Sequence, residues 1–282
     1  MRMKLGQKIA INYIRAKLNL LAVLSKKRAA KKAFDLFCTP LKKSKKQLPA
    51  IFDEAEQLMV TVKAVAVRGF RWNKGGSKRV LILHGFESSS RNFEAYISPL
   101  IDKNYEVLAF DAPAHGVSGG RQITLPIYIE TIRTIYFELG TVQGFISHSF
   151  GGLALTHFIE KIPHDGNTKL VLIAPATETK TAIDTFFRFL QLGSNVRKEF
   201  EKLILQKSGM PPDFFSIPRA LEHIKASILW IHDRDDDVTP LKDVEPVMDK
   251  HYTNLQFLIT SGLGHRKIYR DSRVIQAVVD FL

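Results

Sequence analysis

The sequence contains one cysteine, Cys38, in 282 residues, and it contains no long apolar run near its start. A single cysteine excludes a disulfide within the chain and is compatible with a reducing compartment. Lysine and arginine interrupt the first thirty residues, and the longest apolar run there, Leu20 to Leu24, is too short for a signal peptide. It is also too short to span a membrane, which takes about 20 apolar residues. We therefore expect a cytoplasmic protein, either free or peripheral at the inner membrane face.

Two kinds of binding site are also missing. Several histidines have no carboxylate or cysteine at metal-ligand spacing, so we expect no metal site and no cofactor. Cys38 has no histidine motif nearby, which favours a buried or incidental thiol over a nucleophile. No basic aromatic platform or recognition helix is apparent, so we expect no nucleic-acid partner. The histidines without such pairing are His157, His164, His223, His232 and His251.

Positive charge is confined to the amino-terminal segment. Residues 1–46 contain fourteen Lys or Arg and one acid, Asp35, whereas residues 47–282 contain 27 bases and 27 acids. Apolar residues recur between these cations, so residues 1–49 are expected to form a basic amphipathic helical arm. We favour docking of this arm on the rest of the chain, and we keep peripheral membrane contact through residues 1–46 as the second interpretation. The apolar residues of the arm include Leu5, Ile9, Tyr13, Leu20 and Leu24.

Short runs rich in Val, Ile and Leu alternate with helical patterns along the rest of the chain. This alternation predicts an α/β domain over residues 50–282, with a parallel sheet and helices on both of its faces. Residues 58–72 alternate between apolar and polar instead, which predicts the antiparallel strands that begin such a sheet. The apolar runs fall at residues 80–83, 105–110, 142–147, 169–174, 227–232 and 254–260.

One connection is far longer than a simple crossover requires. About fifty residues separate the strand that ends at Ala174 from the next strand. We interpret residues 176–222 as a cap insertion. Its aromatic residues, Phe186, Phe187 and Phe189 among them, either roof an apolar substrate pocket or only pack the cap itself.

A candidate nucleophile lies in the run from Gly144 to Gly152. An apolar strand stops there at Ser149, with the small residues Ser147 and Gly151 two positions away on either side. A sharp turn from strand to helix exposes a serine hydroxyl and tolerates only small neighbours. The pattern is typical of a nucleophile elbow, with Ser147 in the place where glycine is more usual.

The other two groups that such a serine needs follow it in the chain. A serine hydroxyl becomes a good nucleophile when a histidine removes its proton and a carboxylate orients that histidine. His265 follows the last apolar strand, and Asp235, Asp236 and Asp237 follow the one before it. The spacing H-x-x-x-D-x-x-x-P from His232 to Pro240 favours Asp236, with Asp235 as the alternative.

These motifs resemble those of the α/β-hydrolase superfamily over nearly the whole chain beyond residue 50. Residues 79–86 resemble its third strand and H-G-x loop, and residues 107–118 resemble its D-x-P-x-H-G-x-S segment. The D-A-P-A-H-G and G-L-G-H-R motifs, with a basic amino-terminal segment that ends in F-C-T-P, resemble those of an uncharacterised bacterial subfamily of these hydrolases. The resemblance implies a mostly parallel twisted sheet, helices on both faces and a helical cap. It also implies an oxyanion hole formed by the backbone N–H groups of Phe86 and Phe150.

Other polar residues of these motifs are expected to support the site. We interpret His84, Asp111 and His115 as groups that hold the oxyanion loop, and we expect His148 to point away from Ser149.

The resulting hypothesis is a serine hydrolase that cleaves carboxylic esters through an acyl-enzyme. Its substrate would be a small molecule with an apolar acyl or ester group, bound in a medium-sized hydrophobic pocket. The same three groups also serve thioesterases, carbon–carbon hydrolases and acyltransferases, and the sequence does not choose among them. The alternative from another class is a non-catalytic member of the fold that binds a ligand or a membrane.

Overall fold

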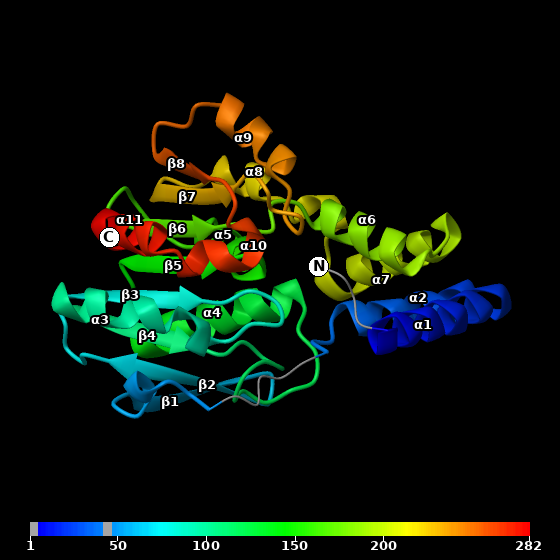
Figure 1. Cartoon of the computed structure of the whole chain (residues 1–282), viewed down its shortest axis with the longest axis horizontal. Coiled ribbons are helices and arrows are strands. Elements are labelled where there is room, and N and C mark those ends of the chain that lie inside the picture. Colours follow the sequence, from blue (N-terminus) through cyan, green and yellow to red (C-terminus); the bar gives the residue numbers. More distant parts are fainter. Residues whose placement is uncertain (1–4, 42–46) are drawn as a thin grey trace. The chain divides into compact units, whose positions relative to one another are not determined.

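The computed structural model describes residues 5–41 and 47–282 of the chain (Figure 1). These residues form two compact units. The helical unit consists of the described residues up to Thr39 together with Glu178–Phe215, and the sheet unit consists of Pro40–Thr177 with Ser216–Leu282. The segments expected as an arm and as a cap thus supply the helices of one unit.

The sheet unit is built on an eight-stranded sheet in the order β1-β2-β4-β3-β5-β6-β7-β8. The pairs β1–β2 and β2–β4 are antiparallel, and all the other neighbouring strands are parallel. The predicted fold class, including the antiparallel start, is confirmed. The strands are β1 (Glu56–Val62), β2 (Val65–Trp72), β3 (Lys78–Leu83), β4 (Tyr105–Phe110), β5 (Gly144–His148), β6 (Lys169–Ile173), β7 (Ser227–Asp233) and β8 (Leu255–Thr260).

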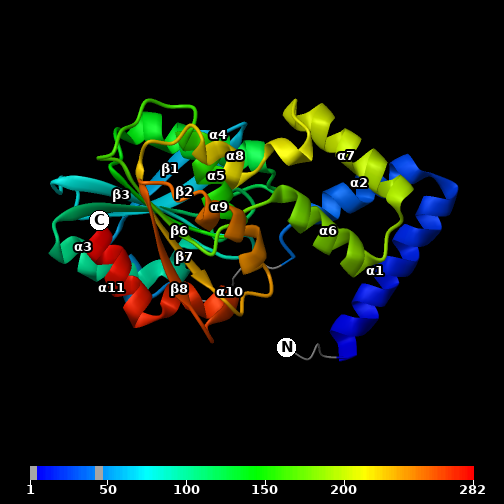
Figure 2. The same ribbon diagram turned by 90° about the horizontal axis from the view of Figure 1, so that it is seen from above.

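Helices cover both faces of this sheet, as Figure 2 shows. On one face, α3 and α11 enclose an aromatic core in which the rings of Phe93 and Tyr269 stack at 5.1 Å. On the other face, α4 packs against α5, which also contacts α8. The central strands are rich in apolar residues because both of their faces are buried. The helices are α3 (Glu94–Asp102), α4 (Leu125–Leu139), α5 (Phe150–Ile159), α8 (Ile217–Leu221), α9 (Glu245–Asp249), α10 (Gly264–Lys267) and α11 (Ser272–Phe281).

The helical unit consists of α1 (Leu5–Leu24), α2 (Lys26–Phe37), α6 (Thr179–Leu190) and α7 (Ser194–Ser208). Helix α2 contacts α1 and α7, and α1 also contacts α6. The Ser25 hydroxyl accepts a hydrogen bond from the third residue of α2, which caps that helix and separates it from α1.

Small and aromatic side chains share the core of the helical unit. Ala29 and Ala33 are fully buried, and the ring of Phe200 lies 5.1 Å from that of Phe187 and 5.7 Å from that of Phe34. Phe187, considered above for a substrate pocket, is therefore a core residue of this unit. Cys38 is buried in the same core, and this burial, with the nearby Asp35 carboxylate, raises its pKa to about 12. At neutral pH its thiol stays protonated and is a poor nucleophile.

Over residues 5–41 and 47–282, no helix is both long enough and apolar enough to cross a membrane.

Candidate active site

Ser149 stands at a sharp turn between β5 and α5. Its φ of 53° and ψ of −120° lie in a region that non-glycine residues rarely adopt. Gly151 makes the turn feasible, because a side chain there would come within 2.7 Å of the Leu83 and His84 carbonyl oxygens. Ser147 is fully buried, and its hydroxyl donates to the Val171 carbonyl at 2.9 Å. That hydrogen bond explains how serine replaces the more usual glycine at this position.

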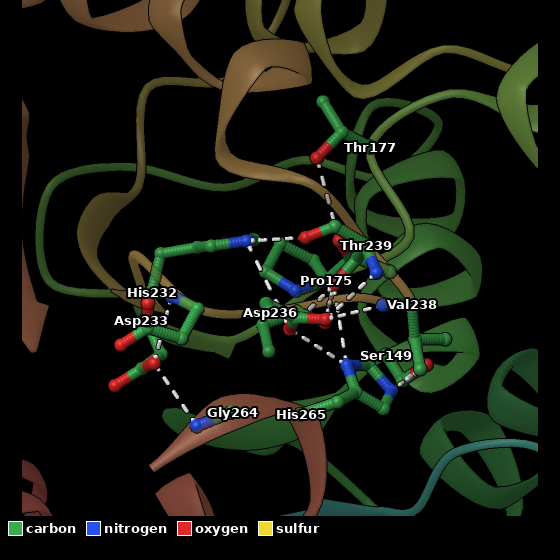
Figure 3. A network of polar contacts seen from close by, with 12 residues as sticks. Ser149, Pro175, Thr177, His232, Asp233, Asp236, Val238, Thr239, Gly264 and His265 are labelled. Carbon is green, nitrogen blue, oxygen red and sulfur yellow. Dashed lines mark hydrogen bonds and ion pairs between the residues drawn. The ribbon is translucent and has the colours of Figure 1, made fainter. Parts of the chain in front are cut away.

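The structure brings Ser149 together with His265 and Asp236 (Figure 3). The Ser149 Oγ atom lies 3.0 Å from Nε2 of His265, and Nδ1 of His265 lies 2.8 Å from Oδ2 of Asp236. A carboxylate only accepts hydrogen bonds, so Nδ1 carries the proton and the lone pair of Nε2 faces the serine hydroxyl. This is the tautomer in which a histidine removes a proton from serine.

Asp236 is held ionised in a buried position. Burial opposes its ionisation, but hydrogen bonds from His265 and from the Val238 and Thr239 amides outweigh it and hold the pKa below the usual range. Both amides donate to Oδ1 at 2.8 Å, and the Thr239 hydroxyl donates to Oδ2 at 2.9 Å. The carboxylate therefore has a fixed orientation toward the histidine.

Hydrogen bonds from the His232 side chain hold the turn that carries Asp236. The His232 Nε2–H donates to the Thr239 carbonyl at 2.7 Å, while its Nδ1 accepts from the Trp230 indole at 3.3 Å. Burial lowers the pKa of His232, in keeping with this neutral form. The first histidine of the H-x-x-x-D-x-x-x-P spacing thus supports the turn.

The two neighbouring carboxylates have different surroundings. Asp235 accepts a hydrogen bond from the Gly262 amide at 2.8 Å, so it supports the loop that leads to His265. Asp237 is exposed. Of the three candidates, Asp236 alone is hydrogen-bonded to the histidine in the structure.

Asp233, which the sequence analysis did not single out, organises the same loop. Its carboxylate accepts from the Gly264 and Leu263 amides at 2.9 and 3.1 Å and from the Thr260 hydroxyl at 2.7 Å. Burial opposes ionisation of this carboxyl, but these hydrogen bonds lower its pKa. Asp233 ends the buried strand β7, and its position as a carboxylate that closes an apolar run is the signal in the sequence that could have identified it.

His148 supports His265 from the other side. Its Nε2–H donates to the His265 carbonyl oxygen at 3.0 Å, and its ring lies 4.7 Å from that of His265 and 4.6 Å from that of Tyr269. Burial, together with repulsion from a charged His265, lowers the pKa of His148 to about 3, so the ring stays neutral. The side chain is directed to the histidine loop and not to the Ser149 hydroxyl.

The loop after β3 lies against the nucleophile. A side chain at Gly85 would come within 2.9 Å of the Ser149 Cβ atom, so only glycine allows this approach. The edge of the Phe86 ring packs on Phe150 at 6.2 Å between ring centroids. Phe86 follows Gly85 in this loop and Phe150 is the first residue of α5, so their backbone amides are the candidate donors to a developing oxyanion.

Buried histidines and Asp111 hold this loop. The His84 Nδ1–H donates to the Gly85 carbonyl at 2.7 Å, and its Nε2 accepts from the Ala112 amide at 2.9 Å. Nε2 of His115 accepts from the Glu87 amide at 3.1 Å, which fixes the backbone next to Phe86. Asp111 accepts from the Ser90 amide and hydroxyl at 2.8 and 2.9 Å. These side chains position the loop and do not contact the Ser149 hydroxyl.

Within the described ranges, no group of three or more His, Cys, Asp or Glu side chains is arranged to hold a metal ion.

Comparisons with known proteins agree with this architecture. A family model described as "Serine aminopeptidase, S33" matches residues 76–217, a span that includes Ser149 but ends before His265. A serine hydrolase-like protein from Danio rerio is 23% identical over 177 residues, which is 61% of this chain and 53% of that protein. The chain thus spans about half the length of this curated relative.

Solved structures of hydrolases share the fold. An esterase from Pyrococcus furiosus superimposes with a TM-score of 0.65 at 23% identity, covering 87% of this chain and 96% of the esterase. Mouse alpha/beta hydrolase domain-containing protein 10 superimposes with a TM-score of 0.60 at 16% identity, covering 80% and 97% of the two chains. The likeness to the α/β-hydrolase superfamily is confirmed at the level of the fold.

Proposed function

The chain belongs to the family of serine aminopeptidase S33, and from this premise we propose that it is a serine hydrolase acting on carboxylic esters. The observation that carries the proposal is the continuous row formed by the Ser149 hydroxyl, the His265 imidazole and the Asp236 carboxylate, with spacings of 3.0 and 2.8 Å. A binding protein has no need of all three groups in this order.

In the proposed reaction, the Ser149 oxygen attacks the ester carbonyl carbon while Nε2 of His265 takes the hydroxyl proton. The carbonyl oxygen becomes an oxyanion, and the Phe86 and Phe150 amides donate to it. His265 then gives the proton to the departing alkoxide, which leaves an acyl group on Ser149. Water attacks this acyl group while His265 takes one of its protons, and His265 then returns this proton to the Ser149 oxygen as the carboxylic acid leaves. Asp236 stabilises the histidine each time it is positively charged.

The backbone at Ser149 favours catalysis over simple ligand binding. A non-glycine residue with this φ and ψ costs on the order of 1–3 kcal/mol of folding free energy, which the surrounding structure must supply. Such strain presents the hydroxyl at the end of β5 and has no evident use in a protein that only binds.

The first test is labelling with a fluorophosphonate, which reacts covalently with activated serines. We expect one adduct, located on Ser149 by peptide mass spectrometry. Labelling should be lost in the Ser149→Ala variant and in His265→Ala, because the second variant lacks the base. A matched control is Ser147→Ala, which removes a neighbouring hydroxyl that is bonded inside the sheet.

The result decides between enzyme and binding module. Absence of labelling in a folded sample, or labelling of His265→Ala at the rate of the unaltered chain, would contradict an activated nucleophile. Esters, thioesters and aminoacyl amides of matched acyl group then define the bond that is cleaved. The amide series is included because the family description names an aminopeptidase.

A further inference from the structure

Helix α1 carries apolar side chains on two opposite faces. One face packs inside the helical unit through Leu18, which is 6% exposed, with Ile14 and Leu21 beside it. Arg15 fastens this side, since its Nε donates to the Phe189 carbonyl at the end of α6 at 2.7 Å. The other face meets solvent. Its side chains and exposed fractions are Ile9 61%, Tyr13 66%, Leu20 66%, Val23 84% and Leu24 77%.

These exposed residues form a continuous stripe. Positions 9, 13, 20 and 24 are separated by four, seven and four residues, which places them along one side of a helix, with Val23 next to them. Single exposed apolar residues are ordinary, but a row of five along one helix indicates a surface that binds something. Figure 2 shows α1 beside α6 and α2, at the edge of the helical unit.

Cations accompany the stripe on α1, which contains no acidic residue, and on α2, whose one acid is Asp35, while Glu199 of α7 lies near Lys27. Lys8 and Lys17 are exposed on α1, and the Lys17 ammonium lies 5.9 Å from the centre of the Tyr13 ring. Helix α2 adds exposed Lys26, Lys27, Arg28, Lys31 and Lys32, and the first acid of the whole sequence is Asp35. Long basic side chains can rest their methylene groups beside an apolar surface while the charge reaches outward.

We propose that this stripe and its flanking cations bind the surface of an anionic lipid bilayer, with α1 lying in the plane of the interface. Apolar residues enter the boundary between headgroups and acyl chains, and lysines bind the anionic headgroups. Charge complementarity selects this partner. A second copy of the chain would bring two strongly basic segments together, and a nucleic acid would leave the apolar stripe against phosphates.

The test is flotation of the full chain with vesicles of phosphatidylglycerol mixed equally with phosphatidylcholine, compared with vesicles of phosphatidylcholine alone. We expect binding to the anionic vesicles that weakens as salt is added. The double variant Leu20→Glu with Val23→Glu should bind more than about tenfold more weakly, because it removes inserted apolar groups and adds repelled charges. The matched control, Met59→Glu with Phe137→Glu, makes the same charge change on residues 59% and 60% exposed in the sheet unit.

The control should bind anionic vesicles like the unaltered chain, and circular dichroism of both variants should match it. Equal binding to neutral and anionic vesicles, or equal loss in both double variants, would overturn the proposal. So would a salt-stable dimer that the Leu20→Glu, Val23→Glu variant dissociates, which would assign the stripe to a second copy. Tight binding of a DNA duplex that survives this variant, without vesicle binding, would assign the cations to nucleic acid.

Discussion

The sheet unit and the helical unit use their side chains in different ways. In the sheet unit, polar groups gather where the parallel strands end, and almost every one around Ser149 has a defined partner within hydrogen-bond distance. In the helical unit, an aromatic core is closed by a helix that remains apolar on its outer side. Proton transfer demands placement within a few tenths of an ångström, whereas a surface contact demands area and charge. Under the two proposals, the reaction belongs to the sheet unit and membrane attachment belongs to the helical unit.

The largest effect should come from Asp236→Asn. The amide cannot hold His265 in the tautomer that accepts the Ser149 proton, so we expect kcat for a soluble ester to fall about 10⁴-fold. Asp237→Asn is the matched control, because its side chain is exposed beside the same turn. Steady-state kinetics on purified variants measure both. Activity of Asp236→Asn within tenfold of the unaltered chain would assign the orienting role to another carboxylate, Asp235 first.

In the helical unit, Phe200→Ala should cost about 3–5 kcal/mol of unfolding free energy. Phe200 is fully buried, and its aromatic neighbours all belong to that unit. Hydrogen exchange should show faster opening of α2 and α7, while ester turnover stays within a few-fold at temperatures below unfolding. The exposed Phe137→Ala is the control. A loss of turnover as large as that of Asp236→Asn would contradict the claim that the helical unit takes no part in the reaction.

A smaller loss of turnover is expected for Gly85→Ala. The new methyl group would lie 2.9 Å from the Ser149 Cβ atom, so the loop that carries the Phe86 amide must move. Loss of one oxyanion donor costs about 100- to 1000-fold in kcat, and we expect the lower end of that range. Gly166→Ala, which meets nothing within 4 Å, should be silent. Unchanged kcat in Gly85→Ala would place the oxyanion elsewhere.

The smallest effect concerns a buried ion pair far from Ser149. The Glu160 carboxylate accepts from Arg219 at 2.7 and 2.8 Å and from His157 at 3.0 Å, linking α5 to α8. Burial opposes its ionisation, but these hydrogen bonds outweigh it and lower the pKa from 4.5 to about 2. Because the pKa is lower in the folded state, the ionised carboxylate stabilises the fold, and this contribution is fully present above pH 4.5. The contribution is lost as the pH falls through about 2, where the folded-state carboxylate becomes protonated.

Glu160→Gln should therefore lower the unfolding free energy by about 2 kcal/mol at neutral pH, after allowance for partial solvent screening. The difference from the unaltered chain should shrink as pH falls below 4.5 and vanish near 2. Urea unfolding across this range measures it, with ester turnover at neutral pH unchanged. A stability difference that is constant with pH would show that the carboxylate charge is not its source.

Much of the sheet unit could be predicted from the sequence because its signals are local. Strands β3 to β7 are short apolar runs, and their parallel arrangement makes the residues that follow them converge at one edge. Ser149, Asp236 and His265 were predicted in this way, and the structure places them within hydrogen-bond distance of one another in a row. Asp233 was missed because most of its partners, the Leu263 and Gly264 amides and the Thr260 hydroxyl, lie more than 25 residues away, and a pattern within one segment does not predict such contacts.

The helical unit was less predictable for a different reason. The amphipathic pattern of α1 and α2 shows that a face must be buried, but it does not say against what. The helices that contact α1 and α2 are α6 and α7. They follow β5 and β6 in the sequence and come from the segment interpreted as a cap. The sequence also could not show that one apolar side of α1 stays exposed, because which side is buried is decided only when the helices pack together.

The most direct test of the central claim is a rapid-quench experiment with a chromogenic p-nitrophenyl ester. The account predicts a burst of about one p-nitrophenolate per chain, with a mass increase equal to the acyl group on Ser149. In Asp236→Asn the burst should slow as much as kcat does, and in Ser149→Ala it should vanish. An acyl group found on another residue, or hydrolysis that Ser149→Ala retains, would contradict the assignment of Ser149 as the nucleophile.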